Sequence, residues 1–221
     1  MMKRLLSILL CAGLLLSCVF PVFAKETDKK EAEETKTVLT IKTVADFLEF
    51  AENCRLDSYS QDLTVSLEAD ISLYDTDFVD IPIFCGTFEG NGHTITELNL
   101  GGEGSYRGLF RYLTESAVVR NLAVQGNVKP TGSRSYVGGI AGSNAGKIEK
   151  CQFTGTVSGS QDVGGMAGIN TVTGIIEGCK VGGVLSGSHF TGGIAGENLG
   201  VIRDCQNLAV VNSTAQQTRW N

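Results

Sequence analysis

The chain has 221 residues, a formal net charge of −6, and 28 glycines against three prolines. An acidic chain without a cluster of basic residues is a poor candidate for binding nucleic acid or an anionic membrane surface. The seven cysteines form no C-x-x-C pair and no Cys/His cluster, so the sequence predicts neither a metal site nor a cofactor site.

The N-terminus has the pattern of a secretory signal peptide. A short basic segment is followed by mostly apolar residues up to Val22, and Val22-Phe23-Ala24 fits the small-x-small cleavage rule. We expect residues 1–24 to be removed after Ala24, which predicts a secreted or cell-surface protein with no membrane insertion afterwards. A retained membrane helix and a lipoprotein anchored at Cys18 are the alternatives. Pro21 argues against the former, and the apolar residues after Cys18 argue against the latter.

The segment after the predicted cleavage site is highly charged. Residues 25–37 mix both signs without apolar partners, so we expect a solvated linker. Because the signal peptide carries two basic residues and no acid, its removal moves the charge from −6 to −8. Five cysteines remain, and an odd number outside the cell argues against a complete disulfide framework.

One amphipathic helix is predicted near residues 44–54. Thr43 is a suitable N-cap, with Asp46 three residues further on. Apolar side chains then recur at helical spacing, at Val44, Phe47, Leu48 and Ala51. Since the first coil of a solenoid exposes an apolar end and an open strand edge, we assign this helix to capping the repeats described below.

The next segments are read as strands separated by polar turns. Residues 63–67 alternate as a half-buried strand, residues 81–84 form an apolar run, and Asn91-Gly92 predicts a tight turn. Four acids and a histidine in this region are the best candidates for a catalytic or calcium-binding site: Asp70, Asp75, Asp77, Asp80 and His93. Exposed aspartates are also common in turns, so a solvated loop is the alternative.

A glycine-rich block recurs in the second half of the chain. Gly139, Gly165 and Gly193 lie 26 and 28 residues apart, and aligning Gly126 with Gly155 adds a divergent earlier copy. We therefore predict repeats at about 107–136, 137–162, 163–190 and 191–212, within a domain of residues 38–218. Period-2 alternation inside this repeat predicts short strands, each paired in register with its equivalent one coil along. The predicted fold is all-β, a solenoid of parallel sheets.

Two further columns of repeated residues are predicted to be structural. Cys151, Cys179 and Cys205 align with the apolar Leu122, so they are expected to point inward as small hydrophobes rather than to bind metal. A stack of asparagines in a turn satisfies backbone groups and its own neighbours, and this role is assigned to Asn144, Asn170 and Asn198. An outward column of alternating charge is expected to form a weak salt-bridge ladder: Arg120, Glu149, Glu177 and Arg203.

These motifs resemble a known family. The pattern G-G-I-A-G-x-N-x-G-x-I-x-x-C, preceded by F-x-G-T-F-E-G-N-G-H-T-I, is similar to the GLUG-type repeat of secreted bacterial proteins over residues 38–212. The resemblance implies a right-handed parallel β-helix on a bacterial surface. Such regions resemble parts of adhesin-like proteins and the non-catalytic segment of bacterial IgA-specific metalloproteases. The chain lacks His-Glu-x-x-His, so no protease activity carries over.

The C-terminus departs from the repeat. A fourth Gly-Gly-Ile is due after residue 218, but the chain reads Arg219-Trp220-Asn221. Codons CGG-TGG-AAT read one base later contain GGT-GGA-AT, which encodes Gly-Gly followed by Ile or Met. We therefore expect an N-terminal fragment of a longer repeat protein, and a simple polar tail at 219–221 is the alternative. The last coil lacks a recognisable cap, which predicts an exposed edge and edge-to-edge self-association.

The sequence thus predicts a non-enzymatic secreted or cell-surface scaffold. Its expected role is an adhesion or interaction region for a protein or glycan ligand at the cell surface. The alternative is a polysaccharide lyase or glycosidase that uses the acids around residues 70–80.

Overall fold

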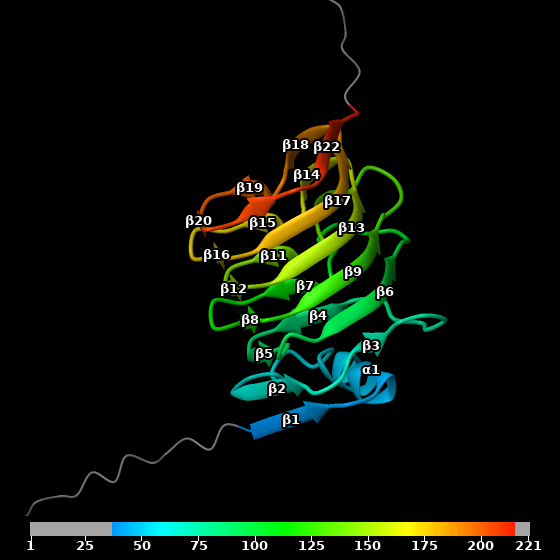
Figure 1. The fold of residues 1–221 in the computed structure, drawn as a ribbon, viewed down its shortest axis with the longest axis vertical. Coiled ribbons are helices and arrows are strands. Elements are labelled where there is room, and N and C mark those ends of the chain that lie inside the picture. Colours follow the sequence, from blue (N-terminus) through cyan, green and yellow to red (C-terminus); the bar gives the residue numbers. More distant parts are fainter. Residues whose placement is uncertain (1–36, 215–221) are drawn as a thin grey trace, which may run out of the picture. The chain divides into compact units, whose positions relative to one another are not determined.

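The computed structural model describes residues 37–214, which form a parallel β-solenoid of about six turns with one short helix (Figure 1). Every strand pair in this part of the chain is parallel, as the stacked-coil prediction requires. The predicted signal peptide, most of the predicted linker and the tail at 219–221 lie outside the described residues.

The strands stack into four sheets. The first sheet contains β1 (Thr37–Ile41), β2 (Leu63–Leu67), β5 (Thr87–Glu89), β8 (Val118–Arg120), β12 (Lys147–Glu149), β16 (Ile175–Glu177) and β20 (Val201–Arg203). The second contains β3 (Ile71–Ser72), β6 (Thr94–Leu100), β9 (Ala123–Val128), β13 (Gln152–Ser158), β17 (Lys180–Gly187) and β21 (Gln206–Asn207), and β22 (Val210–Ser213) also pairs with β17. The third contains β4 (Ile81–Phe84), β7 (Phe110–Leu113), β11 (Ala141–Asn144), β15 (Ala167–Asn170) and β19 (Ala195–Asn198). The fourth contains β10 (Ser135–Gly138), β14 (Gln161–Gly164) and β18 (His189–Gly192).

The register stacks each residue on its equivalent in the next coil. Gly126 pairs with Gly155, which places the divergent early copy in line with the later ones. The inward positions form one continuous core, and its composition changes along the axis. Phenylalanines fill the early coils, where the ring of Phe84 lies 5.3 Å from that of Phe110. In the later coils Phe153 is the only buried phenylalanine of the described residues, and Ile, Val, Cys and Met predominate.

The helix α1 (Val44–Asn53) packs against the early coils. Thr43 caps it, and the side chain of Asp46 accepts a hydrogen bond from the Thr43 backbone N–H at 2.9 Å, which completes a capping box. The ring of Phe50 lies 5.9 Å from those of both Phe84 and Phe88. The predicted apolar stripe was placed wrongly in one respect. Val44 is 36 % exposed, and the buried face runs through Phe47, Phe50 and Ala51, because the first turn projects beyond the core.

One corner explains why the repeat spacing alternates between 26 and 28 residues. Asn170 pairs with Asn144 and with Asn198, and Ile175 pairs with Lys147 and with Val201. Between these fixed points the middle coil has two more residues than its neighbours, and Val172 there is 75 % exposed. The corner therefore absorbs the extra length as a surface loop, and the register on either side is unchanged.

A column of glycines runs through the second sheet. Gly126, Gly155 and Gly183 have φ values of +153°, +156° and +104° and stack in register beside Leu98 of β6. A Cβ atom at Gly155 would overlap the carbonyl oxygen of Gly126, so both the backbone angle and the close approach of coils require glycine. Within residues 37–214, the ten-residue α1 is the longest helix and is too short to cross a bilayer.

Candidate functional site

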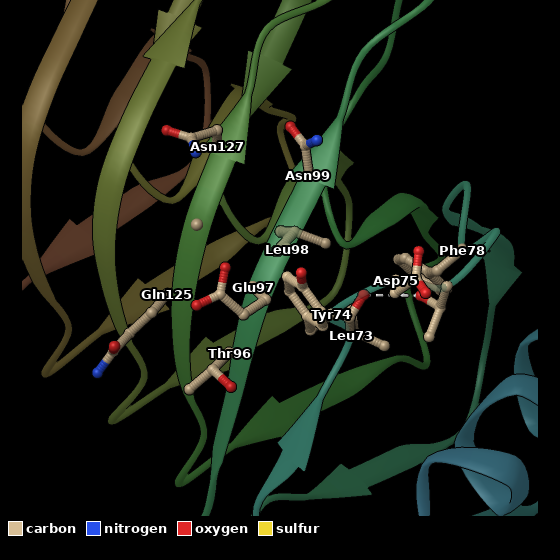
Figure 2. Close-up of a pocket in the computed structure, with 12 residues that line it drawn as sticks. Leu73, Tyr74, Asp75, Phe78, Thr96, Glu97, Leu98, Asn99, Gln125 and Asn127 are labelled. Atoms are coloured by element: carbon tan, nitrogen blue, oxygen red, sulfur yellow. Dashed lines mark hydrogen bonds between the residues drawn. The ribbon is translucent and has the colours of Figure 1, made fainter.

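A polar cleft of about 610 Å³ opens over the second sheet at the early coils (Figure 2). Its floor is formed by the outer face of β6 and β9, and one wall is the loop that follows β3. Eight polar side chains line it: Tyr74, Asp75, Thr76, Thr96, Glu97, Asn99, Gln125 and Asn127. Amide and carboxylate groups gathered over a solvent-facing sheet offer several hydrogen-bond donors and acceptors to one ligand.

A β-bulge in β6 positions these groups. The pairing of β6 with β9 shifts register between Ile95 and Leu98, and Glu97 inside the shift has a φ of +58°. Beyond the bulge Leu98 and Leu100 point into the core, so Asn99 between them faces outward. Figure 2 shows Glu97 and Asn99 on the strand at successive levels of the cleft.

An amide pair lies across the two strands. Asn99 is directly opposite Asn127 in the β6–β9 register, and both project from the same face in Figure 2. Gly126, which has no side chain, precedes Asn127 and leaves the floor open between Gln125 and Asn127. Tyr74, 76 % exposed, stands beside Glu97 and adds an aromatic surface to the wall.

Three of the four acids predicted around residues 70–80 line one cavity, which lies beside α1. Asp75, Asp77 and Asp80 line this cavity of about 490 Å³, and Asp75 also lines the polar cleft. Asp70 lies apart from both cavities and receives hydrogen bonds from the Thr94 backbone at 2.8 Å and from His93 at 3.2 Å. These hydrogen bonds lower the pKa of Asp70. Among residues 37–214 no three Asp, Glu, His or Cys side chains are grouped so that they could hold a metal ion.

Asp80 has a structural partner that the sequence reading missed. Its carboxylate is buried and forms an ion pair with the buried guanidinium of Arg107, and Arg111 approaches the same carboxylate at 3.8 Å. A signal was present in the sequence, since Arg107 stands over Val137 in the repeat. An arginine in an apolar column requires a buried counter-ion.

The cysteine column lies along the core. Cys151 and Cys179 are buried and Cys205 is partly buried, and all three are free thiols. The Cys151 thiol donates a hydrogen bond to the Glu149 carbonyl at 3.3 Å. Burial raises the pKa of Cys151 well above its ordinary value, so this residue is a neutral, packed thiol.

The asparagine column forms a continuous side-chain ladder. The amide of Asn144 donates to the Oδ1 of Asn170 at 2.8 Å, and the amide of Asn170 donates to the Oδ1 of Asn198 at 2.7 Å. Asn170 also donates to the carbonyl of Gly174 at 3.1 Å, across the extended corner. The ladder thus holds adjacent coils together, and Asn170 and Asn198 also close the turns that follow them.

The four charges of the outward column are all paired, but only the pair of Glu177 and Arg203 lies within the column itself. Arg203 lies 2.9 Å from Glu177, and Lys147 lies 3.2 Å from Glu177 and 3.0 Å from Glu149. Hydrogen bonds from Arg203 and Lys147 lower the pKa of Glu177 to about 2. Arg120 pairs instead with Glu89 of the preceding coil. With its charges paired, the first sheet presents fewer free groups than the polar cleft does.

The comparisons with known proteins support the same repeat. The GLUG motif matches residues 133–158, which contain β10 to β13, one strand from each of the four sheets. The chain carries the GLUG motif. A segment of 93 residues, 42 % of the chain, is 39 % identical to halomucin of Haloquadratum walsbyi (strain DSM 16790 / HBSQ001). That segment spans about 1 % of the length of halomucin. No solved structure matches the chain.

Proposed function

We propose that this protein is a non-enzymatic scaffold of the cell surface, which acts in adhesion by holding a glycan in the polar cleft. The observation that carries the proposal is the amide pair Asn99 and Asn127, set on a rigid sheet next to the exposed ring of Tyr74. Amides provide both donors and acceptors for sugar hydroxyls, and an aromatic ring offers its face to the C–H groups of a sugar. The signal peptide expected at residues 1–24 supports the surface location.

A second candidate function is cleavage of a polysaccharide. The observation that favours it is the presence of two carboxylates, Asp75 and Glu97, in the lining of one cleft. Glycoside hydrolysis requires a pair of carboxyl groups flanking the scissile bond. The two candidate functions are therefore distinguished by one observation: an enzyme releases products from a bound polysaccharide, and a binding scaffold does not.

The test uses the full chain and a panel of purified neutral and acidic polysaccharides. We expect binding without release of reducing ends or unsaturated products. We expect Asn127→Ala to weaken binding by about tenfold, the equivalent of one or two hydrogen bonds. Gln152→Ala is the matched control, because Gln152 is an exposed amide on β13 of the same sheet and outside the cleft.

Two results would overturn the proposal. If no polysaccharide in the panel binds, or if Asn127→Ala and Gln152→Ala behave alike, the cleft does not hold a glycan. If products are released and Glu97→Gln abolishes that release, the protein is an enzyme rather than a binding scaffold.

A further inference from the structure

A second surface feature lies at the corner where the fourth sheet meets the third. One position in each coil adopts a left-handed backbone and turns its side chain away from the core. This column holds Tyr106, Tyr136, Asp162 and Phe190, with φ values of +58°, +62°, +52° and +49°. The flanking residues fix the order, since Gln161 pairs with Ser135 and with His189. Asp162 therefore lies between two aromatic residues on successive coils.

Asp162 is a largely buried residue whose carboxylate keeps some contact with solvent and has no compensating cation beside it in the described part of the chain. The residue is only 7 % exposed, and within the described part of the chain its side chain forms neither a hydrogen bond nor an ion pair. Burial, and secondarily the charge of Glu197, raises the pKa of Asp162. Gly196 makes close backbone contact with Asp162, which brings the adjacent Glu197 to the same place on the surface. The local electrostatics therefore favour a positively charged group from outside the protein.

Tyr136 and Phe190 flank Asp162, one coil to either side of it. Neighbouring coils are spaced about 4.8 Å apart, so Tyr136 and Phe190 are separated by roughly 10 Å along the axis. One face of Tyr136 stacks on Tyr106 at 4.6 Å, so its opposite face is directed toward the coil of Asp162. Phe190 is 70 % exposed. A cation held at the level of Asp162 would be one coil spacing, about 5 Å, from the coils of both aromatic residues, within the range of a cation–π interaction.

We propose that the slot formed by Tyr136, Asp162, Phe190 and Glu197 binds an organic ammonium group. The carboxylates supply the counter-charge and the rings supply cation–π contacts to the C–H groups next to the nitrogen. A small metal dication fits less well, because aromatic rings provide no oxygen ligands. The chemistry suits either a quaternary ammonium compound or the protonated amine of an amino sugar. This site is separate from the polar cleft and adds a specificity for cationic ligands to the scaffold.

The experiment titrates the full chain at neutral pH by NMR with four small probes. Choline is compared with its neutral isostere 3,3-dimethylbutan-1-ol, and glucosamine is compared with N-acetylglucosamine. We expect a charged probe to bind and its neutral partner to bind at least tenfold more weakly. Binding of choline alone assigns a quaternary ammonium ligand, and binding of glucosamine alone assigns an amino sugar. Both outcomes support the site.

Variants locate the binding and guard against misfolding. We expect Asp162→Asn and Tyr136→Leu each to weaken binding at least tenfold, while Asp75→Asn, which alters an acid of the polar cleft, has no effect. Because Asp162→Asn removes a buried unpaired charge, its melting temperature at neutral pH should equal or exceed that of the wild type, so lost binding does not reflect lost folding. Equal affinity for charged and neutral probes, no binding of either charged probe, or full binding by Asp162→Asn would overturn the proposal.

Discussion

Replacing Asn170 with alanine is expected to weaken the solenoid more than any other change in the asparagine ladder. Asn170 is fully buried and is the middle rung, so its loss affects both neighbouring coils. The buried amide of Asn144 loses its acceptor, whereas the carbonyl of Gly174 keeps the hydrogen bond from the Val201 backbone N–H at 2.9 Å. A buried orphaned group costs about 1–3 kcal/mol, so this substitution should lower the free energy of unfolding by about 2 kcal/mol.

This loss should be easy to measure. At about 2–4 °C per kcal/mol for a domain of this size, Asn170→Ala should lower the melting temperature by roughly 4–8 °C in a thermal scan followed by circular dichroism. The matched control is Asn198→Ala at the exposed end of the ladder, which should cost less than about 1 kcal/mol. Equal shifts for the two variants would refute the reasoning, because the ladder would then contribute no more inside the core than at its surface.

Three other changes test the remaining structural features. Gly155→Ala should cost at least about 3 kcal/mol in urea unfolding or prevent folding, since its Cβ would overlap the Gly126 carbonyl. Gly182→Ala should be tolerated, because a Cβ at Gly182 would have no neighbouring atom closer than 3.6 Å. Arg107→Met should cost about 3–5 kcal/mol by stranding a buried carboxylate, and adding Asp80→Asn should recover most of this loss; no recovery would argue against the ion pair. Glu177 should stay ionised down to about pH 2 in an NMR titration, so the stability it contributes is complete above its unfolded pKa and declines as the pH falls toward 2; titration near its ordinary pKa would contradict the ion-pair column.

The parallel coils were predictable because stacking makes each residue the neighbour of its own equivalent. A fixed spacing of Gly126 and Gly155, or of Asn144 and Asn170, is therefore direct information about contacts between strands. The same logic placed the larger residues of the early copy over the smaller ones of the later copies. Phe110 pairs with Ala141 for this reason.

The candidate site was less predictable because it depends on departures from the repeat. The polar cleft exists where the bulge at Glu97 turns the second sheet, and nothing repeats at that point in the later coils. The ion pair of Asp80 and Arg107 joins residues 27 positions apart in the divergent early coils, where the spacing gives no alignment. At the slot, Asp162 likewise takes the place of an aromatic residue in its column. Its importance follows from its burial and from the charge of Glu197 nearby, which the repeat spacing does not reveal.

The extended corner after Asn170 has a consequence for how such a surface can change. The Asn170 side chain bonds to Gly174 on the far side of the loop, so the two ends are held together whatever lies between them. A change in the length of the loop at residues 171–173 should therefore leave the strand register of the coils unchanged. A lineage could lengthen or rewrite this loop to escape recognition or acquire a new ligand, without rebuilding the core. For the same reason, a foreign peptide inserted after Val172 should be displayed on the outside of an otherwise unaltered solenoid.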